Sequence, residues 1–294
     1  MTTSPVGAHP AEHVARPSEQ SLLDAWRQLV EAHAQQTARL RETAVADDFW
    51  GTGYGGSTVD MERPAPQCAV IADLLQPDDT LLDIGAGFGG TMLPLASRVS
   101  RVTALDPSPG MTTLLKRNIS QHGITNVDVL EPDAWPPTRP IERHDVCLCA
   151  FVIYEVPDIG AFLDAMERHA RRLCILAVAE RGTGFTPVEP FFERLHGERH
   201  IRQPALRETL AVLGARRRRF DVRTYPFLQF EPEDIDSALD FWRGNYFVRE
   251  GSEKDGMLRQ LLLDEFGVGG TQVAMPHPAG THAAIISWEP PRHA

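Results

Sequence analysis

The chain has 294 residues, 42% of them apolar, which is typical of a globular protein with one large domain or two small ones. Its 40 acidic side chains outnumber its 29 basic ones, and the formal charge of −11 argues against a general affinity for nucleic acid. No window holds the roughly 18 apolar residues of a membrane span, and the start of the chain lacks the apolar core of a signal peptide. We therefore expect a cytoplasmic protein with no membrane partner.

The N-terminal region divides into a tail, a helix and a glycine-rich segment. Residues 1–20 are rich in Pro, Ser, Thr and His without apolar periodicity, which is the composition of a disordered tail. Residues 21–62 contain a predicted helix that begins near Ser21, followed by four glycines among aromatic residues that include Trp50 and Tyr54. Such a composition suits either a linker that packs on the core or a lid over a ligand.

From residue 63 onward, strand and helix patterns alternate. Strands are predicted at 80–84, 101–106, 127–130, 146–153 and 173–179. Helices are predicted between them, at 69–75, from Met92 to Ala96, from Met111 to about Gly123, and at 159–166. This alternation predicts an α/β fold with a doubly wound, mostly parallel sheet.

The C-terminal part is less regular. Two more strands, at 218–225 and 282–288, are predicted to pair antiparallel at the sheet edge, which makes a seven-stranded sheet with an antiparallel C-terminal strand. Helical patterns occur within the segments about 181–215 and 227–280, which we interpret as helical insertions that form a cap. Residues 63–294 are therefore expected to form one domain.

The most informative segment is LLDIGAGFGG at 81–90, between a strand and a helix. Its glycines let the backbone approach a ligand closely, and the helix start offers unpaired N–H groups and the positive end of a dipole. Gly85, Gly87 and Gly90 fit the G-x-G-x-x-G pattern of a dinucleotide site, with Asp106 at the end of the next strand to bind ribose hydroxyls. A polar, nucleotide-like ligand is therefore expected.

The presence of Asp83 before the glycines indicates a ligand other than a dinucleotide. With Gly85, Gly87 and Gly89 it spells D-x-G-x-G-x-G, and over residues 65–180 and the C-terminal strand pair the chain resembles the class I S-adenosylmethionine-dependent methyltransferases, a Rossmann-like family. The antiparallel last strand also fits this family better than it fits a nicotinamide enzyme. The resemblance implies S-adenosylmethionine as the cofactor and methyl transfer as the activity.

The same resemblance implies roles for residues at four consecutive strand ends. Asp83 would lie near the amino-acid part of the cofactor, Asp106 would hold the ribose diol, and Asp133 would contact the adenine. The cofactor-binding residues that it implies are Asp83, Gly85, Ala86, Gly87, Gly89, Asp106, Pro107, Met111, Asp133, Ala134, Phe151 and Tyr154. In sequence, an aspartate that caps a helix and an apolar run in the core would look the same.

The acceptor side carries no such signature. Methyl transfer from a sulfonium is an in-line displacement, in which a protein orients the nucleophile and, where necessary, removes its proton. The candidates for proton transfer are Tyr154, Glu155, His196 and His200, and those for an apolar acceptor pocket are Trp50, Tyr54, Trp242 and Tyr246. His196 and His200 have the i, i+4 spacing of zinc ligands, but no third ligand stands out and no metal is expected.

These features favour methylation of an oxygen or nitrogen of a small organic molecule, with nucleic acid disfavoured as a partner. The run from Arg216 to Arg219 would suit RNA, so an RNA or protein methyltransferase is the second hypothesis, although a solvated strand entrance is the favoured explanation of the run. A third hypothesis is a non-catalytic protein that binds S-adenosylmethionine.

Overall fold

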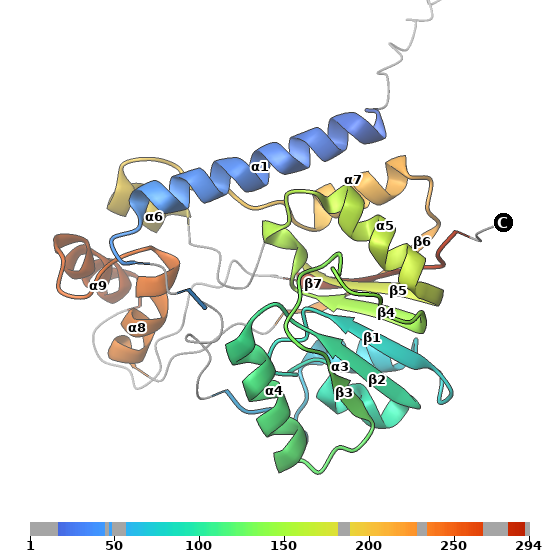
Figure 1. Cartoon of the computed structure of the whole chain (residues 1–294). Helices are drawn as coiled ribbons and strands as arrows, with labels where there is room; N and C mark the ends of the chain where they lie inside the picture. Colours follow the sequence, from blue (N-terminus) through green and yellow to red (C-terminus); the bar gives the residue numbers. More distant parts are fainter. Residues whose placement is uncertain are drawn as a thin grey trace, which may run out of the picture.

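The computed structural model describes residues 17–44, 47–48, 57–181, 189–227, 234–266 and 282–291. Its centre is a seven-stranded sheet with the strand order β3-β2-β1-β4-β5-β7-β6 (Figure 1). The strands are β1 Thr80–Ile84, β2 Arg101–Leu105, β3 Val127–Val129, β4 His144–Ala150, β5 Ala170–Ala179, β6 Phe220–Pro226 and β7 His282–Trp288. Strands β1 to β5 run parallel, and β7 is antiparallel to both of its neighbours, β5 and β6. The predicted fold class is confirmed.

Burial explains which strands lie at the centre. β1, β4 and β5 are apolar on both sides because helices cover both faces of the sheet there, as is usual for central parallel strands. The edge strands differ: β3 has only three residues, and most of β6 is exposed. The strand order reverses between β1 and β4, and open α/β sheets bind ligands at the carboxyl ends of the strands beside that point.

The helices form one layer on each face of the sheet (Figure 1). One layer holds α3 Pro66–Ala72, the 3-10 helix η1 Leu93–Arg98 and α4 Pro109–Gln121, and the other holds α1 Glu19–Leu40, α5 Ile159–His169 and α7 Leu206–Ala215. Trp26 of α1 shows how the second layer is fixed: its ring is 1% exposed, and its Nε1 donates a hydrogen bond to the Val156 carbonyl oxygen (2.8 Å). The N-terminal helix is therefore an integral part of the core.

Three further helices, α6 Glu189–His196, α8 Ile235–Asn245 and α9 Glu253–Phe266, pack around a separate apolar cluster, which we call the cap. Figure 1 shows the cap at the C-terminal end of α1, beside the sheet. Gln36 of α1 fastens the loop after α6, since its Nε2 donates to the Arg199 carbonyl oxygen and its Oε1 accepts from Ile201 N, both at 2.8 Å. Helix α1 thus joins the cap to the rest of the protein.

Several predicted elements differ in type or in bounds from those in the structure. The helix expected through Met92 is the short 3-10 helix η1, with a proline at its start. The strand expected at 146–153 ends at Ala150, because Phe151 takes a φ of 60° and a second 3-10 helix, η2 Ile153–Glu155, follows. The first α-helix begins at Glu19, capped by the Ser18 hydroxyl, slightly before the predicted start.

Candidate functional site

The glycine-rich turn after β1 is shaped by three glycines with positive φ: 74° at Gly85, 55° at Gly87 and 94° at Gly89. A Cβ on Gly85 would lie 2.4 Å from Val152 Cγ2, and one on Gly89 would lie 2.7 Å from Leu93 Cδ1, so both glycines are required by packing. Among the described residues, a Cβ on Gly87 would meet nothing closer than Met111 Sδ at 4.0 Å. As far as these residues go, the backbone at Gly87 is open to the close approach of a ligand.

Asp106, directly after β2, holds this turn. Its Oδ2 accepts a hydrogen bond from Gly87 N (2.8 Å), and its Oδ1 accepts one from Ser108 N (2.9 Å) at the start of α4. The residue is 7% exposed, and burial raises the pKa of its carboxyl. Each oxygen retains a lone pair beyond its backbone donor, so the carboxylate can also accept hydroxyl groups from a ligand.

Asp83, at the end of β1, is more deeply buried, with 2% of its surface exposed. Among the described residues none donates a hydrogen bond to its carboxylate. Burial, and then the nearby charge of Asp106, raise its pKa to about 7. Because a buried carboxylate without donors is costly, a ligand that brings hydrogen-bond donors or positive charge would be stabilised here.

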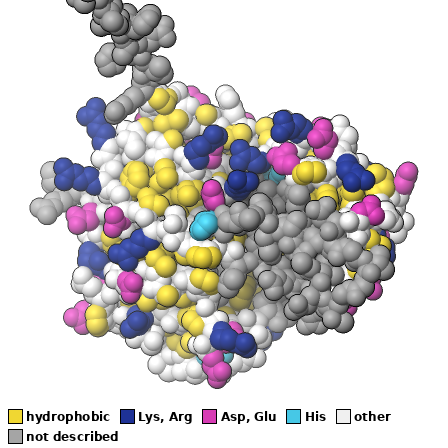
Figure 2. Space-filling model, turned by 180° about the vertical axis from the view of Figure 1, so that it is seen from behind, with side chains coloured by type: hydrophobic (Ala, Val, Ile, Leu, Met, Phe, Trp, Pro, Cys, Tyr) yellow, Lys and Arg dark blue, Asp and Glu magenta, His cyan; other side chains and the backbone are white. Residues whose placement is uncertain are grey.

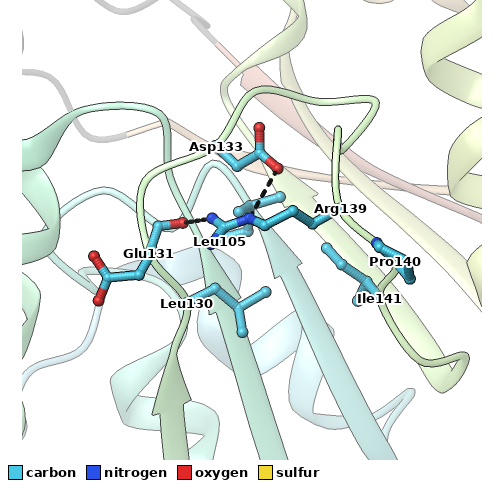
Figure 3. A pocket seen from close by; sticks show the side chains of 7 residues that line it. All are labelled: Leu105, Leu130, Glu131, Asp133, Arg139, Pro140 and Ile141. Carbon is cyan, nitrogen blue, oxygen red and sulfur yellow. Dashed lines mark hydrogen bonds and ion pairs between the residues drawn. The ribbon is translucent and has the colours of Figure 1, made fainter.

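A cavity of about 160 Å³ lies past the ends of β2 and β3 (Figure 3). It is lined by Leu105, Leu130, Glu131, Asp133, Arg139, Pro140 and Ile141. Asp133, the predicted adenine contact, lines this cavity, and its carboxylate accepts hydrogen bonds from Thr138 N and Oγ1 (3.0 Å each). Figure 3 shows Arg139 between Asp133 and the Glu131 carbonyl oxygen, to which its Nη2 donates (2.7 Å). The side chains of Asp133, Thr138 and Arg139 are thus fixed by contacts within this loop, and the remainder of the lining includes the apolar Leu105, Leu130 and Ile141.

Phe151 and Tyr154 follow β4 but lie in different surroundings. Phe151 is partly buried, and its ring centroid lies 5.2 Å from that of Phe227. Phe227 comes directly after β6 and was not among the residues predicted from sequence. Tyr154 is 2% exposed, its hydroxyl accepts from Ala179 N (2.8 Å), and burial raises its pKa. The tyrosine hydroxyl is therefore part of the packed core.

The other candidates for proton transfer fall into two places, with Glu155 after β4 and with His196 and His200 both against the ring of Phe192 (centroids 4.6 and 4.7 Å apart). Glu155 is exposed, and its Oε1 accepts a hydrogen bond from Gln203 Nε2 (3.3 Å). His196 lies in the cap, with Nε2 2.9 Å from the Tyr246 carbonyl oxygen and Nδ1 3.2 Å from Lys254 Nζ. His200 is 7% exposed, and neither ring nitrogen has a hydrogen-bond partner among the described residues. Both histidines therefore make structural contacts inside or beside the cap.

Of the four aromatic residues predicted to line the acceptor pocket, the structure describes two. Trp242 and Tyr246, both on the cap side, are 5% and 1% exposed, with ring centroids 5.4 Å apart. They form the apolar centre of the cap itself. Trp50 and Tyr54 lie outside the described residues.

The arginine run before β6 takes part in intramolecular ion pairs. Arg216 Nη1 donates to Asp164 Oδ1 (2.8 Å), and Arg218 donates through Nε and Nη2 to the buried carboxylate of Glu167 (2.7 and 2.8 Å). Figure 2 shows basic and acidic side chains interspersed over one face of the molecule. Pairing of this kind satisfies the charges of Arg216 and Arg218 within the protein, which weakens the case for an RNA-binding run.

The described residues contain neither a candidate metal site nor a candidate membrane-spanning helix. No group of three or more His, Cys, Asp or Glu side chains there is placed to hold a metal ion, and the four cysteines are free and buried. No described helix combines the length and apolar character that crossing a membrane requires.

Comparisons with known proteins agree with this geometry. Residues 81–172, which run from β1 into β5, match the model of a methyltransferase domain. The aklanonic acid methyltransferase DauC of Streptomyces sp. (strain C5) is 26% identical over 144 residues, which cover 46% of this chain and 65% of that protein. A probable ribosomal RNA small subunit methyltransferase A of Methanosphaera stadtmanae is 35% identical over 60 residues, covering 20% of this chain and 22% of that protein.

Among solved structures, the YcgJ protein of Bacillus subtilis has the same fold, with a TM-score of 0.51 and 15% identity over 76% of this chain and 98% of that one. The chain spans less than two thirds of the length of either curated relative. The domain match coincides with the turn, the two buried aspartates and the cavity. Residues 81–172 therefore form a methyltransferase domain, and for this domain the resemblance to the class I S-adenosylmethionine-dependent methyltransferases is confirmed.

Proposed function

We propose that the protein transfers a methyl group from S-adenosylmethionine to an oxygen or nitrogen of a small organic molecule. The observation that carries the proposal is the pair of buried carboxylates, Asp83 and Asp106, beside an open glycine turn at the switch point of the sheet. One carboxylate lacks a donor and the other has acceptor capacity to spare, which is the complement of an ammonium group and a ribose diol.

The described residues fit the cofactor along its length. Asp83 would accept from its amino group, Gly87 offers free space for close approach, and Asp106 would accept from its ribose hydroxyls. The cavity beside Leu105 and Leu130 offers an apolar surface of the kind that an adenine ring requires. When bound, the cofactor supplies a methyl group that its sulfonium already activates. Ala86, Pro107, Met111 and Ala134 remain proposed members of this site.

The protein's own contribution would be orientation and, for some acceptors, removal of a proton. An in-line displacement needs the acceptor atom held opposite the sulfonium, and Phe151 with Phe227 would form an apolar wall for it. Of the four candidates for proton transfer, Glu155 alone is exposed. Glu155 is therefore the side chain that we propose as general base where the acceptor needs one. No covalent nucleophile is required by this reaction.

Two observations favour a small acceptor over RNA, namely the negative net charge of the chain and the ion pairs of its arginine run. The formal charge of −11 repels phosphate, and two arginines of the basic run are held by Asp164 and Glu167. The relative that acts on aklanonic acid supports a small acceptor, whereas the ribosomal RNA methyltransferase relative keeps the second hypothesis in view. A non-catalytic protein that binds the cofactor is the third.

The decisive experiment is calorimetric titration with S-adenosylhomocysteine, with NADH titrated in parallel. Micromolar binding of S-adenosylhomocysteine alone is expected, and binding of NADH alone would refute the proposed cofactor site. Labelled S-adenosylmethionine is then incubated with a panel of phenols, amines and carboxylic acids, and separately with total RNA. Label in a small acceptor supports the proposal, and label in RNA alone supports the second hypothesis. Cofactor binding without transfer to any acceptor would favour the non-catalytic protein.

A further inference from the structure

Two described residues of the chain between α1 and α3, Asp48 and Ser57, are hydrogen-bonded to helix α4 or to its N-cap. Asp48 accepts a hydrogen bond from Ser108 Oγ through Oδ1 (2.6 Å) and one from Gly110 N through Oδ2 (2.7 Å). Further along, Arg117 Nη2 donates to the Ser57 carbonyl oxygen (2.6 Å). The first attachment places a carboxylate against the opening turn of α4, which begins just after Asp106.

Ser108 connects this carboxylate directly to Asp106. Its backbone N donates to Asp106 Oδ1 (2.9 Å), while its hydroxyl donates to Asp48 Oδ1. The charge of Asp48 adds to burial in raising the pKa of Asp106, and the charge of Asp106 adds to burial in raising that of Asp83. Three carboxylates thus act on one another along the site, and their mutual repulsion favours binding of a cation beside them.

The two forms of the cofactor differ in charge. S-adenosylmethionine carries a sulfonium and has one net positive charge, whereas S-adenosylhomocysteine, which remains after methyl transfer, has none. A site whose affinity depends on a row of carboxylates will therefore bind the first more tightly than the second. A residue that acted only as a mechanical attachment would change both affinities alike.

We propose that Asp48 is a positioning residue of the cofactor site, which holds the start of α4 next to Asp106 through Ser108 and Gly110, and whose negative charge makes the site prefer S-adenosylmethionine to S-adenosylhomocysteine. This inference rests on the proposed cofactor site. Asp48, which lies outside the glycine turn and the strand ends, would thereby assist product release. Loss of the sulfonium charge on methyl transfer weakens the complex with S-adenosylhomocysteine, which must then dissociate.

The test compares two neutral replacements, Asp48→Asn and Asp48→Ser, with a matched control, Asp47→Asn, whose side chain is exposed in the same segment. Affinities for S-adenosylmethionine and S-adenosylhomocysteine are measured by calorimetry at low ionic strength. Both Asp48 variants are expected to lower the ratio of the two affinities by about fivefold, the effect of one charge several ångströms away in a partly solvated site. Asp47→Asn should leave that ratio within about twofold of the wild-type value.

The outcomes separate this inference from the function on which it rests. Equal weakening of both ligands in the Asp48 variants would overturn the charge role, and unchanged affinities would overturn the positioning role as well. Failure of the wild-type protein to bind either ligand would instead remove the cofactor site, and the inference with it. Thermal melts show whether each variant is folded, and the two replacements differ enough in shape that a folding defect in one leaves the other as the test.

Discussion

The buried His200 predicts a loss of stability in mild acid. Its ring packs edge-on against His33, with centroids 5.4 Å apart, and burial lowers its pKa to about 4 from an ordinary 6.5. Between these values the unfolded chain binds a proton that the folded chain does not, so the free energy of unfolding falls as pH falls. A gap of this size corresponds to about 3 kcal/mol once pH is below the folded-state pKa, and to roughly 1 kcal/mol at pH 5.5.

Replacement of His200 by Leu removes this penalty, because Leu fills a similar volume and brings no nitrogen that needs a partner. Urea denaturation followed by tryptophan fluorescence at pH 7.5 and 5.5 should show the variant losing about 1 kcal/mol less than the wild-type protein across that interval. His122→Leu is the control, since His122 is exposed at the end of α4. Parallel losses in His200→Leu and the wild-type protein would refute this reasoning, because they would mean that the His200 proton is accommodated in the folded state.

Three further substitutions test the site and its supports. Asp106→Asn should weaken S-adenosylhomocysteine binding at least tenfold in calorimetry, because each charge-assisted hydrogen bond contributes about 1.5–3 kcal/mol; unchanged affinity would remove Asp106 from the site. Gly85→Ala should cost about 2 kcal/mol or more in urea denaturation, given a φ of 74° and a Cβ 2.4 Å from Val152 Cγ2; wild-type stability would show that the turn can shift. Glu167→Ala leaves the Arg218 guanidinium without its carboxylate and should cost about 3 kcal/mol, so an unchanged melting temperature would contradict the ion pair's role.

Much of the sheet could be predicted from sequence because each central strand is an apolar run bounded by polar or turn residues. TLLDI at 80–84 is predicted to the residue for this reason. The end of β4 could not be predicted in this way. Apolar residues continue through Phe151, Val152 and Ile153, but the strand ends at Ala150 because Phe151 takes a φ of 60°. That conformation depends on tertiary contacts, among them the hydrogen bond from Phe151 N to the Ala177 carbonyl oxygen, which no local pattern encodes.

The residues of the candidate site likewise fall into two groups, those that sequence patterns predict and those that they do not. Asp83, Asp106 and the glycines follow strand ends, where sequence spacing and sheet topology fix their positions together. Asp48 and Phe227, which we propose as further members of the site, come from segments without a motif, and only the folded chain brings them next to Ser108 and Phe151. The aromatic pattern around Trp242 correctly indicates burial, but the same pattern serves a pocket wall and a helical core equally, and in the structure it forms the core of the cap.

The position of β7 has a consequence for synthesis of the protein. Residues 282–288 are translated after the other six strands, yet they lie in the sheet between β5 and β6. Until this segment leaves the ribosome, the outer edge of β5 and the β6 strand lack the backbone partners that they have in the finished sheet, and the Glu167 carboxylate lacks the Trp288 indole donor (3.0 Å). The nascent chain therefore exposes two unpaired strand edges late in translation, a state that is prone to association with other chains and that chaperones recognise.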